Sequence, residues 1–195
     1  MIMEKKQLDT EEVKTMALIY MLFIKSIRGD LTVTDIMNCA AVGVDFNYMD
    51  LFCESGTLLH IVCGLPYTKP EIVQALISAG ADVNLKNQFF EQTPLHCAVR
   101  SGSLPVIKEL IKAGADINAR DVNKDTPLTY IAETNNIESM KYMIRKGADI
   151  SLKNHEGKTP LDIFRKVQSE NIDWLEKAWE ESVTKQKSKT TDNKK

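Results

Sequence analysis

A four-residue phrase recurs along this chain at a spacing near 33 residues, and this repeat constrains the fold more than any other feature. Its copies are Thr57-Leu58-Leu59-His60, Thr93-Pro94-Leu95-His96, Thr126-Pro127-Leu128-Thr129 and Thr159-Pro160-Leu161-Asp162, at steps of 36, 33 and 33 residues. A second phrase, Gly-Ala-Asp followed by Val-Asn, Ile-Asn or Ile-Ser, occupies 80–84, 114–118 and 147–151, with a weaker copy at 43–47. Two phrases in phase predict a stack of repeats instead of one globular core.

The chemistry of one repeat predicts two short helices followed by a turn. Thr93 is a favourable N-cap because its hydroxyl can accept a hydrogen bond from a free amide of the first turn, and Pro94 suits the first helical position. Gly114 can take the left-handed conformation that ends the second helix, and the polar segment 116–125 predicts a projecting finger. The apolar stripe of the second helix consists of Val106, Ile107, Leu110 and Ile111. Each unit is too small to bury this face alone, so neighbouring units must cover it.

These motifs, in this order and spacing, resemble the ankyrin repeat, whose consensus places Thr-Pro-Leu-His at the start of its first helix and Gly-Ala-Asp-Val-Asn after its second. The resemblance covers roughly residues 43–165. It implies an all-α ankyrin-repeat solenoid of about five stacked helix pairs with projecting β-turn fingers. The repeat specifies a fold, whereas function depends on the surfaces that the fold carries.

Both ends of the chain diverge from the consensus and are predicted to cap the stack. Residues 1–47 predict an N-terminal capping helix pair, with one helix from about Glu11 to Arg28 and another that ends near Val42. Three clear repeats then cover 48–158, and a C-terminal capping repeat covers 159–183. The tail 184–195 holds five lysines, one aspartate and no apolar side chain, which predicts disorder.

Charge and apolar patterning argue against several classes of partner. The net charge of −2 provides no general attraction to nucleic acid or to an anionic membrane. The longest apolar run, 16–24, is about half the length of a membrane span, and the acidic residues before it are unlike a signal peptide. Four cysteines without a secretion signal indicate a reducing compartment. We therefore expect a monomer in the cytoplasm, with the nucleus or delivery into a host cell as alternatives, and buried structural thiols at Cys63 and Cys97.

No motif predicts catalysis, a cofactor or a metal site. Paired cysteine spacings of the zinc-binding type do not occur in the sequence. The segment 157–159 resembles the end of a phosphate-binding loop, but Leu152 stands where that loop requires glycine. We therefore expect no enzyme activity, no catalytic residue, no cofactor and no metal ligand.

The histidines of the repeat phrase have a structural explanation. The resemblance implies that His60 and His96 tie adjacent fingers together by hydrogen bonds. Thr129 and Asp162 stand at the matching positions of the next two repeats, and this departure predicts weaker finger contacts there.

Departures from the consensus indicate where a partner would bind. The finger after Asn84 is one residue longer than the finger after Asn118 and carries Phe89 and Phe90. Adjacent aromatic residues at a finger tip predict a contact anchor, although the rings could instead pack on a neighbouring finger. The insertion 64–70 would lift Leu65 and Tyr67 toward the concave rim, where ankyrin arrays commonly hold partners. Ordinary solvated turns remain an alternative there. The residues expected to contact a partner are Phe89, Phe90, Leu65, Tyr67, Arg100, Ser103, Asn123, Lys124, Glu133 and Asn135.

The function that these observations favour is a non-enzymatic protein–protein interaction module, either an adaptor or an inhibitor. It would bind a partner protein through finger tips and concave groove. A regulatory or targeting subunit of an enzyme or transcription-factor complex is an alternative that the sequence leaves open. Lysine greatly outnumbers arginine, as in proteins of AT-rich genomes, so a host-directed effector of an intracellular bacterium or virus is a further alternative.

Overall fold

The computed structural model describes residues 10–49, 56–134 and 136–167 together with positions 173 and 177. This part of the chain contains nine α-helices and no β-strand, which confirms the all-α prediction. The helices are α1 (Thr10–Arg28), α2 (Val33–Ala41), α3 (Leu58–Gly64), α4 (Pro70–Ser78), α5 (Pro94–Ser101), α6 (Leu104–Lys112), α7 (Pro127–Thr134), α8 (Ile137–Arg145) and α9 (Pro160–Val167).

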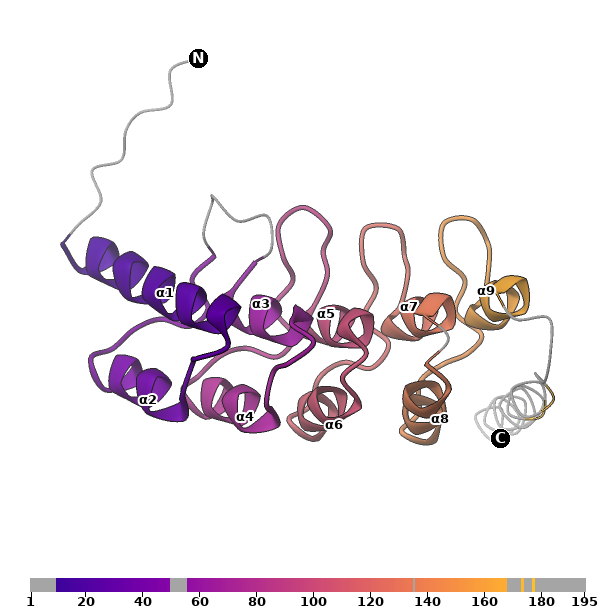
Figure 1. Ribbon diagram of the computed structural model, residues 1–195. Helices are drawn as coiled ribbons and strands as arrows, with labels where there is room; N and C mark the ends of the chain where they lie inside the picture. Colours follow the sequence, from indigo (N-terminus) through magenta and orange to yellow (C-terminus); the bar gives the residue numbers. More distant parts are fainter. Residues whose placement is uncertain (1–9, 50–55, 135, 168–172, 174–176, 178–195) are drawn as a thin grey trace, which may run out of the picture.

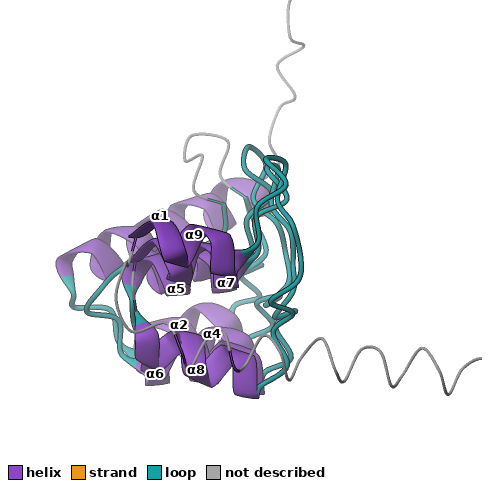
Figure 2. Ribbon diagram, turned by 90° about the vertical axis from the view of Figure 1, so that its right-hand side faces the viewer, coloured by secondary structure: helices purple, strands orange, loops and turns teal. Residues whose placement is uncertain are grey.

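The helices form two layers that run along a single stack (Figure 1). The odd-numbered helices make one layer, in which α3 packs on α5, α5 on α7 and α7 on α9, and the even-numbered helices make the other. The loops that follow α4, α6 and α8 lie in one column along an edge of the stack (Figure 2). The predicted solenoid is confirmed. The predicted tail 184–195 lies outside the described residues, and the predicted C-terminal capping repeat, 159–183, is described only at 159–167, 173 and 177.

The repeated phrases account for the core. The leucine of each first phrase is buried in its helix, and the second helices contribute a matching apolar row between the layers. Cys39, Cys63 and Cys97 are buried and free, and burial raises the pKa of the Cys63 and Cys97 thiols. These two cysteines are therefore protonated packing residues, as the sequence predicted, while Cys53 lies outside the described residues.

The second phrase builds a ladder of hydrogen bonds between repeats. Asn84 Oδ1 accepts from the Asp116 N–H at 2.7 Å, and Asn84 Nδ2 donates to the Gly114 carbonyl at 3.1 Å. Asn118 Oδ1 likewise accepts from the Asp149 N–H at 2.8 Å. The weaker copy at 43–47 takes part as well, because its Asn47 Oδ1 accepts from the Asp82 N–H at 2.7 Å. The first helix pair is thus joined to the stack by the same bonds as the clear repeats.

One buried position breaks the apolar pattern of the second helices. Ser139 is the third residue of α8, where Ile72 stands in α4 and Val106 in α6. Its side chain is fully buried, and its Oγ has no hydrogen-bond partner among the described residues. A buried hydroxyl without a partner loses its hydration without compensation.

Removing this hydroxyl is expected to stabilise the protein. Ser139→Ala should raise the free energy of unfolding by about 1–2 kcal/mol, because it deletes an unsatisfied polar atom and improves helix propensity. Urea unfolding followed by circular dichroism measures the change. Ser78→Ala, at the exposed end of α4, is the matched control and should change stability by less than about 0.5 kcal/mol. A lower stability of Ser139→Ala would show that the hydroxyl has a favourable interaction.

Candidate functional site

The three fingers that the structure describes in full share one local design, in which an Asn or Asp side chain at the base folds the loop above it. Asn87 Oδ1 accepts from the N–H groups of Phe90 and Gln92 at 3.3 and 3.0 Å. Asp121 and Asn154 make the equivalent pairs of bonds in the next two fingers. Backbone bonds close the loops at 87–92, 121–125 and 154–158. The second finger, 87–92, is therefore one residue longer than the two that follow it.

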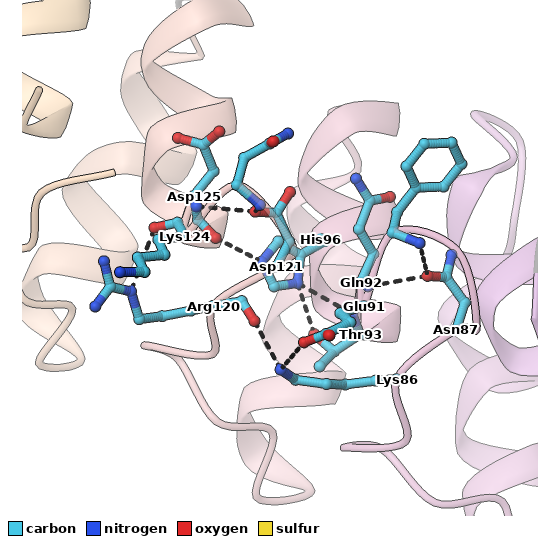
Figure 3. Close-up of polar contacts among 12 residues, drawn as sticks. Lys86, Asn87, Glu91, Gln92, Thr93, His96, Arg120, Asp121, Lys124 and Asp125 are labelled. Carbon is cyan, nitrogen blue, oxygen red and sulfur yellow. Dashed lines mark hydrogen bonds and ion pairs between the residues drawn. The ribbon is translucent and has the colours of Figure 1, made fainter. Parts of the chain in front are cut away.

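Each of these fingers has a left-handed residue just before its closing bond. Glu91, Lys124 and Gly157 have φ values of 52°, 61° and 73°. The Lys124 carbonyl accepts from Arg120 Nε at 3.3 Å (Figure 3). Asn123 and Lys124 are both exposed at the tip of the third finger. These two predicted contact residues are thus accessible, and the loop geometry holds their backbone in place.

Neighbouring fingers are hydrogen-bonded to one another. The Val122 N–H donates to the Phe90 carbonyl at 2.9 Å, and the His155 N–H donates to the Asn123 carbonyl at 2.9 Å. Lys86 Nζ donates to the Arg120 carbonyl at 2.8 Å (Figure 3). Because each loop is braced by its own side chains and by the next loop, the fingers form a pre-organised surface.

Two buried histidines connect the helices to the fingers. His96 Nδ1 accepts from the Thr93 N–H at 3.1 Å, so this nitrogen carries no proton, and its Nε2–H donates to the Asp125 carbonyl at 3.3 Å. His60 repeats the arrangement with Thr57 at 3.2 Å and the Gln92 carbonyl at 3.0 Å. Burial lowers the pKa of both rings, and that of His96 falls to about 4. The predicted hydrogen bonds from these histidines to the next finger are confirmed, and in each case the neutral imidazole ring makes them.

The next two repeats keep only the local half of this arrangement. Thr129 Oγ1 accepts from the Thr126 N–H at 3.1 Å, and Asp162 Oδ2 accepts from the Thr159 N–H at 2.9 Å. Finger contact there is made by other side chains, since Asn154 Nδ2 donates to Asp125 Oδ1 at 2.9 Å.

A chain of hydrogen-bonded polar side chains that the sequence did not predict joins the second and third fingers. Tyr130 OH donates to Asp121 Oδ2 at 2.7 Å and accepts from Gln92 Nε2 at 2.8 Å. The Tyr130 ring also packs edge-on against the His96 ring, with ring centroids 5.8 Å apart. Burial and the neighbouring Asp121 raise the pKa of Tyr130. One sequence signal could have indicated the Asp121 end of this chain. An Asn or Asp recurs at the base of each finger, at Asn87, Asp121 and Asn154, with the same spacing as the Gly-Ala-Asp phrase.

A groove of about 330 Å³ lies between the second finger and helices α3 and α5. Leu65, Phe90 and Arg100, which are far apart in the sequence, all line it. Arg100 Nη2 donates to Gln92 Oε1 at 3.2 Å, which holds the guanidinium at the edge of the groove. The structure thus brings together three of the residues predicted to contact a partner.

The two aromatic side chains of the second finger remain accessible. Phe89 is 58% exposed and Phe90 is 47% exposed, and of the two only Phe90 lines the groove. Phe90 contacts the third finger through its backbone carbonyl. Whether these side chains bind a partner therefore stays a prediction.

The other predicted contact residues that the structure describes do not line this groove. Tyr67 donates its hydroxyl to the Ile27 carbonyl at 2.6 Å, so it joins the insertion 64–70 to the end of α1. Ser103 is the N-cap of α6, and Glu133 is exposed on α7, where partial burial and the nearby Asp125 and Asp121 raise its carboxyl pKa. Asn135 lies outside the described residues. Their part in partner binding stays a prediction.

Within the described residues, no three metal-ligating side chains gather in one place. None of the described helices is long and apolar enough to cross a membrane.

The chain matches a family model. A family model described as ankyrin repeats (3 copies) matches residues 22–121 and 59–154, a combined range of 22–154 that contains α2 to α8 completely. No curated protein matches the chain.

Proposed function

This chain belongs to the ankyrin-repeat family, and we propose that it is a non-enzymatic adaptor or inhibitor that binds a partner protein with its second finger and the adjoining groove. Ankyrin repeats are protein–protein interaction modules, and proteins built from them are typically non-enzymatic scaffolds.

The observation that carries the proposal is the pair of exposed aromatic rings on a braced finger. Phe89 and Phe90 are 58% and 47% exposed, while the finger below them is held by Asn87 and by its bond to Val122. Large aromatic side chains in the middle of an interface contribute a large share of binding energy. Because the finger is already ordered, little conformational entropy is lost when a partner covers the rings.

The groove indicates the chemistry of the segment that would enter it. Its lining combines the half-buried Ile61 and Leu65 with Phe90, and Arg100 is the one formally charged side chain in that lining. A partner segment with an apolar side chain followed by a carboxylate would bury the first against these residues. The carboxylate would then accept hydrogen bonds from the guanidinium.

The double variant Phe89→Ala/Phe90→Ala tests the proposal. We expect partner recovery from native lysate, measured by quantitative mass spectrometry, to fall at least about tenfold, because truncated aromatic anchors commonly cost more than 1.4 kcal/mol. Thermal stability should change little, since both rings are about half exposed or more.

Val122→Ala is the matched control, because Val122 is 45% exposed on the neighbouring finger. This variant should recover the partner as the unaltered chain does. If the double variant also recovers the same proteins in equal amounts, the aromatic tip is not the anchor. Loss of recovery on Leu65→Asp alone would then assign binding to the groove.

A further inference from the structure

The groove beside the second finger contains a glycine where the matching residues of the other repeats are large and charged. Gly64 is the eighth residue counted from Thr57, and the residues at the same place after the next three phrase threonines are Arg100, Glu133 and Lys166. All four positions are exposed, and Gly64 and Arg100 both line the groove. The first of these repeats therefore lacks a side chain where the others carry a charged one.

The backbone of α3 does not require glycine at this position. Gly64 is the last residue of the helix, and it is not one of the glycines with positive φ. A Cβ added to Gly64 would lie 3.9 Å from the Cβ of Cys97, an ordinary van der Waals distance and the closest contact among the described residues outside the neighbouring backbone. Glycine also weakens a helix relative to alanine. What Gly64 provides is therefore open space in the groove.

A second small side chain enlarges the same space. Cys97 directly follows the four-residue phrase of its repeat, where the other repeats have Ile61, Tyr130 and Ile163. Cys97 also lines the groove. Two positions that carry larger side chains elsewhere in the stack thus carry small ones in this groove, next to each other. We call the space between Gly64 and Cys97 the recess.

The groove also has one positive charge, and this charge has no acidic partner. Arg100 Nη2 donates to Gln92 Oε1, which belongs to a neutral amide, at 3.2 Å. None of the ion pairs among the described residues involves Arg100. A guanidinium has five N–H donors, so Arg100 has donors left for a carboxylate. The charge that complements the groove is therefore negative.

We propose that Gly64 and Cys97 make the groove selective for a partner segment with a bulky apolar side chain, such as leucine, methionine or phenylalanine, and an Asp or Glu close behind it. The apolar side chain fills the recess and the carboxylate binds Arg100. This inference rests on the proposed function and adds the residues that set its specificity. The groove volume of about 330 Å³ is at the lower end of the range for ligand pockets, so it accepts a short segment.

Selection of random displayed peptides on the whole chain tests this proposal. We expect the enriched peptides to share a bulky apolar residue with Asp or Glu close behind it. Gly64→Leu places a side chain in the recess, so it should weaken binding of a labelled enriched peptide at least about tenfold, measured by fluorescence anisotropy. Gly64→Ala adds one carbon and should weaken binding less.

Lys166→Leu is the matched control, because it adds leucine at the matching exposed position of α9, outside the groove. This variant should bind the peptide as the unaltered chain does. Arg100→Gln should weaken binding of the enriched peptide, but not of the same peptide with its Asp or Glu replaced by Asn or Gln. Circular dichroism verifies that every variant is folded.

Equal affinity of Gly64→Leu and the unaltered chain, or enriched peptides without a bulky apolar residue, overturns the role of the recess. If Phe89→Ala/Phe90→Ala weakens peptide binding while Gly64→Leu does not, the proposed function stands and the recess alone is wrong. A library that yields no binding peptide also overturns the recess as a site for a short segment. Partner recovery from lysate then still tests the proposed function independently.

Discussion

Leu95→Ala is expected to lower the free energy of unfolding by about 3–4 kcal/mol, because it empties a fully buried position in the middle of the stack. Leu95 lies in α5, which packs against both α3 and α7. The truncated side chain leaves a cavity that short helices held on two sides cannot close by moving together. Since single domains are stable by only about 5–15 kcal/mol, this loss is a large part of the total.

Urea unfolding followed by far-ultraviolet circular dichroism measures the effect of Leu95→Ala. Repeat arrays are stabilised by contacts between neighbours, so weakening a central repeat should also broaden the transition as the two halves of the stack unfold less cooperatively. Leu152→Ala, at a half-buried position after the last copy of the second phrase, is the control and should cost about 1 kcal/mol or less. A similar cost for both variants would contradict the central role of the α3–α5–α7 contacts.

Acidification is expected to remove about 3 kcal/mol of stability through His96 alone. The pKa of His96 is about 4 in the folded protein because the ring is buried, against an ordinary value near 6.5. Between these values the unfolded chain binds more protons than the folded chain, so stability falls with pH. The contribution is fully present above about pH 6.5, declines below it and is lost once the pH reaches about 4.

Other groups modify this profile in known directions. Burial also lowers the pKa of His60, which adds to the loss of stability on acidification. Burial raises the pKa of the Asp125 carboxyl, so its protonation on acidification favours the folded state and offsets part of the loss. The histidine effect begins at higher pH, because a histidine titrates above a carboxyl in the unfolded chain. The initial decline below pH 6.5 is therefore due to the histidines.

His96→Thr separates this effect from general acid unfolding. The third repeat already has threonine at this position, and Thr129 keeps the bond from the Thr126 N–H. The variant should be less stable than the unaltered chain at pH 7, because it loses the bond to the Asp125 carbonyl, but its stability should fall less between pH 7 and pH 4.5.

Urea midpoints at the two pH values give the comparison. His155→Thr, at an exposed position, should keep the pH dependence of the unaltered chain. An equal decline in His96→Thr and the unaltered chain would show that His96 is not the group that titrates.

The histidines and the proposed binding surface are physically connected. His60 bonds to the Gln92 carbonyl at the end of the second finger, and the Gln92 side chain bonds to Arg100 and Tyr130. Gln92 therefore links the hydrogen bonds that order the second finger to Arg100, the charged residue of the groove. A rigid scaffold of this kind places partner-binding side chains without moving on binding.

Much of the fold followed from the sequence because the repeat phrases are local signals. Caps, prolines and glycines act on residues within a few positions of themselves, so their spacing predicted the helix bounds, the finger positions and the stack. The predicted helix from about Glu11 to Arg28 corresponds to α1, at Thr10–Arg28. The sequence also showed that the finger with Phe89 and Phe90 is one residue longer than the next finger, because the spacing between the two repeat phrases is longer there.

The arrangement of the surface could not be read in the same way. Leu65, Phe90 and Arg100 share a groove, whereas Tyr67, two residues from Leu65, bonds to Ile27 on the first helix pair. Contacts between residues about 30 positions apart depend on how one repeat is shifted and rotated against the next. The periodic sequence pattern would be the same for any such shift, so it does not predict these contacts. The chain's sequence therefore determined that repeats stack, and the packing between repeats determined which side chains meet.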